Sequence, residues 1–272
     1  MIAAAVSATR PPQPSTDMAN FFRTEGLQKS FGGVRAVRDV SLAITAGVVF
    51  AIIGPNGAGK STLLNLMSGI YQPDAGKMIF AGIDLIGLPA HRRVQHGLAR
   101  TFQKIRLFKQ LSALDNVIAG FHIHHDLPAW QYVLHGTAFR REQARCRGEA
   151  VKLLTFMGLE KRMDVPAGSL SYGEQRMLEI ARALATRPRL LMVDEPAAGL
   201  NAAEVEALLD RIGVLRAQGI TVVVVEHNMD LVMKVADRLL VMDYGQYLFE
   251  GIPAEVQSHP GVIAAYLGAE IH

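Results

Sequence analysis

Apolar residues fall into two kinds of run along the chain. Short, uninterrupted runs rich in β-branched residues alternate with longer stretches in which apolar positions recur every three or four residues. The first kind is typical of strands buried on both faces, and the second of helices that pack on a sheet. The predicted strands are 34–44, 48–53, 76–80, 97–102, 190–193, 221–225 and 239–242. The predicted helices are 60–68, 176–185, 202–216 and 229–236.

The stretch from about 111 to 185 differs from its flanks. It has few β-branched runs and carries helix-period apolar residues, Val151, Leu154 and Met157, so we expect an α-helical subdomain there. Alternating strands and helices elsewhere predict an α/β fold with a largely parallel sheet. Residues 21–268 are expected to form one domain. Residues 1–20 are predicted to be a disordered extension, or to precede a true start at Met18.

Composition narrows the class of protein. Half of the 272 residues are apolar and the net charge is +3, which allows a sizeable core but does not argue for nucleic acid as a partner. No apolar run approaches the ~18 residues of a membrane helix, so we do not expect the chain to span a membrane by itself. The single cysteine, Cys146, allows no disulfide within the chain and fits a reducing compartment.

A glycine-rich loop follows the buried strand 48–53 and precedes a helix. It matches G-x-x-x-x-G-K-[ST], the pattern of a phosphate-binding loop in that structural context. Glycines let main-chain amides wrap around phosphate oxygens, and the helix N-terminus adds its positive end. We expect Lys60 to reach the β- and γ-phosphates of ATP and Ser61 to offer its hydroxyl to Mg²⁺. The predicted nucleotide-binding residues of the loop are Gly54, Pro55, Asn56, Gly57, Ala58, Gly59, Lys60, Ser61 and Thr62.

An acidic pair closes the strand 190–193. Asp194 and Glu195 follow four apolar residues, and ligands of open α/β sheets sit at the carboxyl ends of strands. We expect Asp194 to hold Mg²⁺ through water and Glu195 to orient or deprotonate the attacking water. Such a pair alone could be only a polar strand end. The phosphate loop in the same chain favours the functional interpretation.

The run Leu170-Ser171-Tyr172-Gly173-Glu174-Gln175 resembles the signature of ABC ATPases, with Tyr172 in place of the usual glycine. The resemblance covers about 21–268 and implies a mixed or parallel sheet core with an antiparallel β subdomain and a helical subdomain. It also implies that Ser171, Gly173 and Glu174 bind nucleotide held by a second ABC ATPase subunit.

The resemblance implies roles for three further residues. Gln103 matches the glutamine that senses Mg²⁺ and nucleotide, His227 matches the switch histidine that joins Glu195 in catalysis, and Phe31 is placed like the aromatic residue that stacks on adenine. Asn201 stands where most members have aspartate, which removes a charge but keeps hydrogen-bonding capacity.

Several runs are similar to the LivG type, the ATPase subunits of branched-chain amino acid importers, among them Arg100-Thr101-Phe102-Gln103 and Ala265-Tyr266-Leu267-Gly268. That resemblance implies ATP hydrolysis coupled to transport at the cytoplasmic face of the inner or plasma membrane. The implied partners are a second ATPase subunit in a homo- or heterodimer, membrane permeases and, indirectly, a periplasmic or surface binding protein.

Three alternatives stay open at this point. The cargo could be urea, a short amide or an aromatic acid, because the ATPase does not touch the cargo. A non-transport ABC ATPase would need long coiled coils or tandem ATPase domains, which the sequence lacks. A different P-loop enzyme, such as a nucleotide kinase, is disfavoured by the signature run and the switch histidine.

Overall fold

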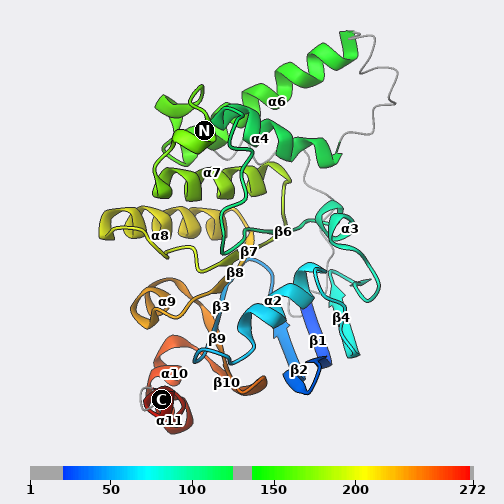
Figure 1. Ribbon diagram of the computed structural model, residues 1–272, viewed down its shortest axis with the longest axis vertical. Coiled ribbons are helices and arrows are strands. Elements are labelled where there is room, and N and C mark those ends of the chain that lie inside the picture. The colour runs from blue at the N-terminus through cyan, green and yellow to red at the C-terminus, as the bar shows by residue number, and fades with distance from the viewer. Residues whose placement is uncertain (1–20, 125–136, 270–272) are drawn as a thin grey trace.

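The computed structural model describes residues 21–124 and 137–269. Two sheets and a group of helices make up this part of the chain (Figure 1). The first sheet is antiparallel, with the order β2-β1-β4-β5. Its strands are β1 (Phe22–Phe31), β2 (Val34–Ile44), β4 (Ala75–Phe80) and β5 (Ile83–Asp84).

The second sheet is mixed and has the order β10-β9-β3-β8-β7-β6. Strands β9, β3, β8, β7 and β6 run parallel, and β10 pairs antiparallel with β9. The turn between β9 and β10 uses positive φ at both Tyr244 and Gly245, as a tight hairpin requires. The strands are β3 (Val49–Ile53), β6 (Leu98–Arg100), β7 (Leu190–Asp194), β8 (Thr221–Val225), β9 (Arg238–Asp243) and β10 (Gln246–Gly251).

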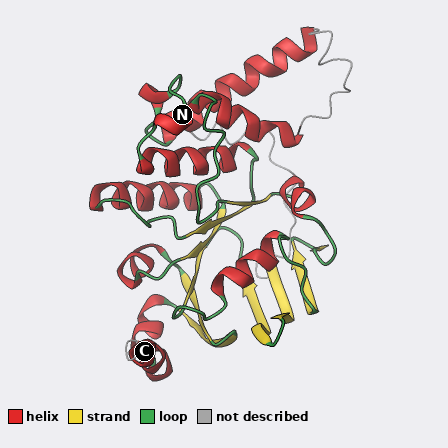
Figure 2. Cartoon of the chain, in the orientation of Figure 1, coloured by secondary structure: helices red, strands yellow, loops and turns green. Residues whose placement is uncertain are grey.

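Helices cover this second sheet and extend beyond it (Figure 2). The longer ones are α2 (Lys60–Ser68), α4 (Ala113–Phe121), α6 (Thr137–Phe156), α7 (Tyr172–Ala185), α8 (Ala202–Ala217) and α11 (Pro260–Ala269). The short ones are α3 (Ala90–Gln95), α9 (Met229–Val235), α10 (Pro253–Ser258) and the 3-10 turns η2 (His122–His124), η3 (Glu160–Arg162) and η4 (Ala167–Ser169). None of the helices in the described ranges is both long and apolar enough to cross a bilayer.

The central strands are apolar throughout because both of their faces are covered. In β8, Val222 and Val224 face the core shared with α4, α6 and α7, whereas Val223 and Val225 face the core shared with α2 and the antiparallel sheet. Successive side chains of a strand point to opposite faces, so one unbroken valine run fills two cores. A third, smaller core lies under α9, α10 and α11.

Most predicted elements are confirmed. Strands β5 and β10 and helices α3, α10 and α11 lie where the sequence pattern predicted no element, and there are three further differences. Strand β1 did not emerge from the sequence pattern as a separate strand. The predicted strand 97–102 is only three residues long, Leu98–Arg100. Helix α7 begins at Tyr172 rather than at Arg176, because Ser171 caps it with a capping box to Glu174. Residues 1–20, predicted to be a disordered extension, lie outside the described residues.

Candidate nucleotide-binding and hydrolysis site

Four neighbouring parallel strands end at the same edge of the mixed sheet. The predicted phosphate loop follows β3, the histidine segment follows β8, the acidic pair ends β7 and the glutamine follows β6. The carboxyl ends of parallel strands meet at one edge, which is where open α/β sheets bind ligands. The topology therefore places these four segments, far apart in sequence, along one line.

The phosphate loop is held by main-chain contacts from distant parts of the chain. The amide of Gly245 donates to the carbonyl of Ala58, and a Cβ on Gly59 would lie 2.3 Å from the carbonyl oxygen of Ala36. At Gly54, a Cβ would lie 2.1 Å from the carbonyl oxygen of Met242. Only glycine fits at Gly54 and Gly59, which explains why the motif requires glycine at these two positions.

Lys60 lies in the first turn of α2 and folds back over the loop. Its Nζ donates to the carbonyl oxygens of Gly54 at 2.6 Å and Pro55 at 3.0 Å. Burial lowers the pKa of Lys60, and the nearby carboxylates of Glu195 and Asp194 oppose that shift. The lysine of the loop and the acidic pair thus share one electrostatic environment.

Asp194 forms a buried ion pair with a residue to which the sequence assigned no role. Arg100 Nη2 lies 2.9 Å from Asp194 Oδ2, and Arg100 Nη1 donates to Asn65 Oδ1 and Ser68 Oγ of α2. Burial raises the pKa of Asp194, and Arg100 opposes the shift. Asp194 Oδ1 is buried and has no hydrogen-bond partner within the described residues, so one carboxylate oxygen stays available for a ligand.

Glu195 and Gln103 are brought together directly. Gln103 Nε2 donates to Glu195 Oε2 at 3.0 Å. Glu195 has φ 45, a left-handed conformation that costs a non-glycine residue on the order of 1–3 kcal/mol and that clusters at functional sites. Its amide donates to the carbonyl of Val225 at 2.8 Å, so the neighbouring strand holds the strained turn in place.

His227 follows β8 with 62% of its side chain exposed. The residue before it, Glu226, is buried, and its carboxylate accepts from the amides of Ala197 and His227. This carboxylate ties the histidine segment to the turn after Glu195. No motif signalled Glu226, because its role depends on a contact across 29 residues.

Phe31, at the end of β1, is 43% exposed and meets the ring of Tyr71 edge-on, with centroids 5.1 Å apart. Lys29 Nζ lies 5.5 Å from the centroid of the Phe31 ring. Tyr71 is a second exposed aromatic residue that the motifs did not indicate. The pair offers an apolar platform of the kind that a nucleotide base can stack on.

The predicted signature residues form a separate group at the N-terminus of α7. Ser171 Oγ accepts from the amide of Glu174, and the Glu174 carboxylate accepts from the amide of Ser171 and from Arg162. A Cβ on Gly173 would lie 2.3 Å from the carboxylate of Glu204 in α8. Figure 1 shows α7 and α2 on different sides of the mixed sheet, so the signature group does not face this chain's own phosphate loop.

Asn201 caps α8. Its side chain accepts from the amide of Glu204 at 3.0 Å, and Glu204 in turn accepts from the amide of Asn201. Asparagine and aspartate are equally good N-cap residues, so Asn201 fills the capping role even though most members of the family have aspartate there.

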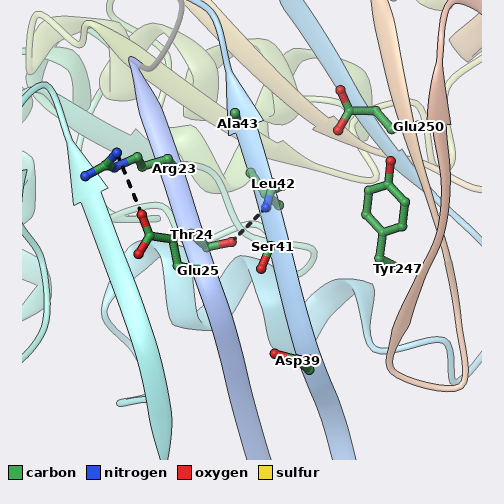
Figure 3. A pocket seen from close by; sticks show the side chains of 9 residues that line it. All are labelled: Arg23, Thr24, Glu25, Asp39, Ser41, Leu42, Ala43, Tyr247 and Glu250. Atoms are coloured by element: carbon green, nitrogen blue, oxygen red, sulfur yellow. Dashed lines mark hydrogen bonds and ion pairs between the residues drawn. The ribbon is translucent and has the colours of Figure 1, made fainter.

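A hollow between the antiparallel sheet and the β9–β10 hairpin lies away from these residues (Figure 3). Two of its three lining carboxylates have cationic partners: Glu25 lies 3.7 Å from Arg23, and Glu250 lies 3.0 Å from Arg238, whereas Asp39 is the third carboxylate. The hollow therefore offers no convergent set of unpaired groups comparable to that around Asp194.

Comparison with known proteins assigns the chain to a family. The ABC transporter family model matches residues 37–198. The chain belongs to the ABC transporter ATPase family. A second model, the branched-chain amino acid ATP-binding cassette transporter, matches residues 248–272.

Relatives and solved structures of this ABC ATPase agree with that assignment. The high-affinity branched-chain amino acid transport ATP-binding protein BraF of Pseudomonas aeruginosa is 42% identical over 89% of this chain and 96% of its own length. LivG of Escherichia coli, described in the same terms, is 39% identical over the same shares. A crystal structure of an ATP-binding cassette in its ADP conformation superposes with a TM-score of 0.79, at 34% identity, over 91% of this chain and 98% of that one. Members of this family bind and hydrolyse ATP.

Proposed function

We propose that this chain is the ATP-hydrolysing subunit of an importer of branched-chain amino acids. The observation that carries the hydrolytic part is the group formed by Lys60, Asp194, Gln103 and Glu195 at one sheet edge, with Gln103 Nε2 3.0 Å from Glu195 Oε2. Hydrolysis of ATP needs positioning and charge neutralisation more than covalent chemistry, and this group supplies one cation, a hydrogen-bonding amide and two carboxylates.

ATP would bind with its adenine against Phe31 and Tyr71 and its phosphates on the amides of residues 54–62. Lys60 would exchange its two carbonyl partners for phosphate oxygens. Glu195 would orient the attacking water and accept its proton, while His227 contacts the γ-phosphate. This assignment follows the motif order and the geometry of the sheet edge.

Magnesium fits the oxygen ligands on this edge. Asp194 Oδ1 is buried without a hydrogen-bond partner in the described part of the chain, and Ser61 is exposed at the start of α2. A hard cation prefers such oxygens, directly or through water. Asp194, Ser61 and Gln103 would hold the ion, which when bound neutralises charge on the β- and γ-phosphates.

The test of the hydrolytic site is Glu195→Gln, with Glu25→Gln as a matched control in the hollow of Figure 3. We expect Glu195→Gln to abolish steady-state ATP turnover while ATP affinity, measured by titration, stays near that of the wild type. Glu25→Gln should change neither quantity. Near-normal turnover by Glu195→Gln would place the base elsewhere.

The cargo is inferred from the relatives. An ATPase subunit does not bind the transported molecule, so its own residues do not indicate which molecule is transported. BraF and LivG are branched-chain amino acid transport proteins by name, and the model matching residues 248–272 carries the same cargo in its description. Uptake of leucine, isoleucine and valine should be lost in a deletion strain and restored by this chain. Loss of urea, short-amide or aromatic-acid uptake instead would reassign the cargo.

We infer that the working assembly contains a second ABC ATPase subunit, identical or similar, two permeases and a binding protein, with this chain peripheral on the cytoplasmic face of the membrane. Another ABC transporter cassette, 25% identical, has been solved as a dimer, and the signature group faces away from this chain's own phosphate loop. Co-expression with permease subunits of a branched-chain amino acid importer should shift the chain into the membrane fraction. A chain that stays unbound beside its permeases would contradict the assembly.

A further inference from the structure

A fully buried ion pair lies near the middle of α7. Arg176 has 0% and Glu179 2% of the side chain exposed, and Arg176 Nη1 lies 2.9 Å from Glu179 Oε2. Burying two charges costs several kcal/mol per ion unless further hydrogen bonds satisfy them. The groups that hydrogen-bond to Arg176 and Glu179 therefore indicate the role of the pair.

Those partners are main-chain groups of one short segment, residues 102–106, which we call the glutamine loop. Arg176 donates to the carbonyl of Phe102 at 2.8 Å and to the carbonyl of Gln103 at 3.0 Å. Glu179 Oε1 accepts from the amides of Phe102 at 3.4 Å and Arg106 at 3.2 Å. The pair therefore bonds both main-chain N–H groups and main-chain carbonyls of the glutamine loop, which lies more than 70 residues earlier in the sequence.

The same guanidinium also reaches the signature end of α7. Arg176 Nη2 lies 3.2 Å from the hydroxyl of Tyr172, and its Cζ lies 5.8 Å from the centre of the Tyr172 ring. A Cβ on Gly199 would lie 2.9 Å from Cε1 of Tyr172, so the ring rests on the main chain of the turn after Glu195. Tyr172, which replaces the usual glycine, is therefore held between Arg176 and that turn.

The other end of the glutamine loop is the site itself. The main-chain carbonyl of Gln103 accepts from Arg176 Nη2, and its side-chain Nε2 donates to Glu195 Oε2, at 3.0 Å for each hydrogen bond. A displacement of α7 must consequently move the side chain that contacts Glu195, unless the bonds to Arg176 break.

We propose that Arg176 is a positioning residue that makes the glutamine loop and the signature end of α7 move as one unit. The inference deepens the proposed ATPase site and rests on it. Its physical content is that the loop has no freedom to shift relative to α7 while the guanidinium bonds both carbonyls. Arginine is suited to this role because its planar fork reaches several acceptors at once.

The informative variant removes both charges together. Arg176→Met alone would leave the Glu179 carboxylate buried without its cation, which commonly destabilises a protein strongly. The double variant Arg176→Met/Glu179→Leu replaces the pair by apolar groups of similar volume, so no buried charge is left without its partner. What it does remove is the set of bonds to the main chain of residues 102–106. Lys152→Met/Glu149→Leu removes an ion pair of the same spacing from α6 and is the matched control.

Three quantities are measured on the full chain: ATP affinity, kcat, and hydrogen exchange of the amides of Phe102 and Arg106. In the double variant we expect ATP affinity within about two-fold of the wild type, kcat lowered about ten-fold or more, and exchange of both amides faster by about ten-fold. The control pair should change none of them. Arg176→Lys, which can still bond one carbonyl, should recover part of kcat.

Unchanged kcat and unchanged exchange in a folded double variant would overturn the proposal. A parallel loss of ATP affinity, thermal stability and kcat would also overturn it, since that outcome indicates a structural role only. Failure of the proposed function can be told apart from failure of this proposal. If the wild-type chain neither bound nor hydrolysed ATP, slow exchange of the Phe102 and Arg106 amides, lost in the double variant, would still show that Arg176 and Glu179 hold the glutamine loop.

Discussion

Two glycines of the phosphate loop form a matched pair for testing how the loop is held. Gly57 has φ 81 and Gly59 has φ 93, so alanine at either position must adopt a left-handed backbone. A Cβ on Gly57 meets nothing within 4 Å, whereas a Cβ on Gly59 would lie 2.3 Å from the carbonyl oxygen of Ala36 and 3.3 Å from the Cα of Gly245. Both obstacles are main-chain atoms and cannot rotate away.

The two substitutions therefore differ by one physical cost. Gly57→Ala should cost about 1–2 kcal/mol of unfolding free energy, the penalty of a left-handed residue. Gly59→Ala should pay the same penalty plus about 1–3 kcal/mol for overpacking against β2 and the hairpin turn. The expected total for Gly59→Ala is about 2–5 kcal/mol, a large part of the ~5–15 kcal/mol that stabilises a typical domain.

Denaturant unfolding of the nucleotide-free protein measures both variants under the same conditions. Nucleotide is left out because ligand that binds only the folded state would add its own stabilisation. We expect the unfolding free energy of Gly59→Ala to be lower than that of Gly57→Ala by at least about 1 kcal/mol. The dependence of that free energy on denaturant concentration should be the same in both variants. Equal losses, or a larger loss in Gly57→Ala, would refute the claim that β2 and the hairpin pack directly against the loop.

Three further changes have clear expected results. Arg93→Met removes a buried guanidinium that donates to the carbonyls of Leu66, Met67, Leu85 and Leu88, and should cost about 3 kcal/mol or more in denaturant unfolding; a loss under about 1 kcal/mol would contradict this role. Asn201→Ala should cost about 1 kcal/mol by removing the cap of α8, whereas Asn201→Asp should be nearly neutral, as thermal unfolding can check. Lys60→Ala should weaken ATP binding by about ten- to hundred-fold; unchanged affinity in a titration would count against the assignment of the loop.

The pattern of apolar residues predicted the strands that are buried on both faces, but it did not predict β1. Strands β3, β7 and β8 are buried on both faces and read as unbroken apolar runs. In β1 the register shifts between Thr24 and Leu27, where Gly26 has φ 60, so the alternation that marks a half-buried strand is interrupted. Thr24 is also buried, with its hydroxyl donating to the carbonyl of Val40, and a polar core residue hides the pattern further.

Helix α7 shows a different reason for a misplaced boundary. Gly173 in the first turn is unfavourable for a helix on propensity alone, so propensity does not indicate the start at Tyr172. In the structure, a Cβ at Gly173 would lie 2.3 Å from the carboxylate of Glu204, so a side chain there would displace Glu204 from its contact with the amide of Asn201. The capping box of Ser171 and Glu174 supplies the start that propensity does not.

Local motifs identified the residues whose spacing is fixed by a loop or a strand end, but not the residues that join these segments. Arg100, Arg176 and Glu226 each contact main-chain or side-chain groups from 29 to 94 positions away. Such contacts depend on strand order, which the sequence pattern does not determine. The three residues are buried charges, and their partners become visible only when the fold brings β6, β7 and β8 together.

The environment of the phosphate loop shows why the C-terminal part of the chain matters to a site that is assembled mostly from earlier segments. Near the end of strand β9, the carbonyl oxygen of Met242 leaves no room for a Cβ at Gly54, and in the turn that follows the amide of Gly245 donates to the carbonyl of Ala58. The carbonyl of Gly245 accepts from Arg38 at 2.7 Å, so the same turn also holds β2 against the loop. The hairpin therefore connects the antiparallel sheet, the phosphate loop and the C-terminal helices. Because its turn contacts are main-chain bonds, they persist under side-chain changes and depend on the register of β9 and β10 instead.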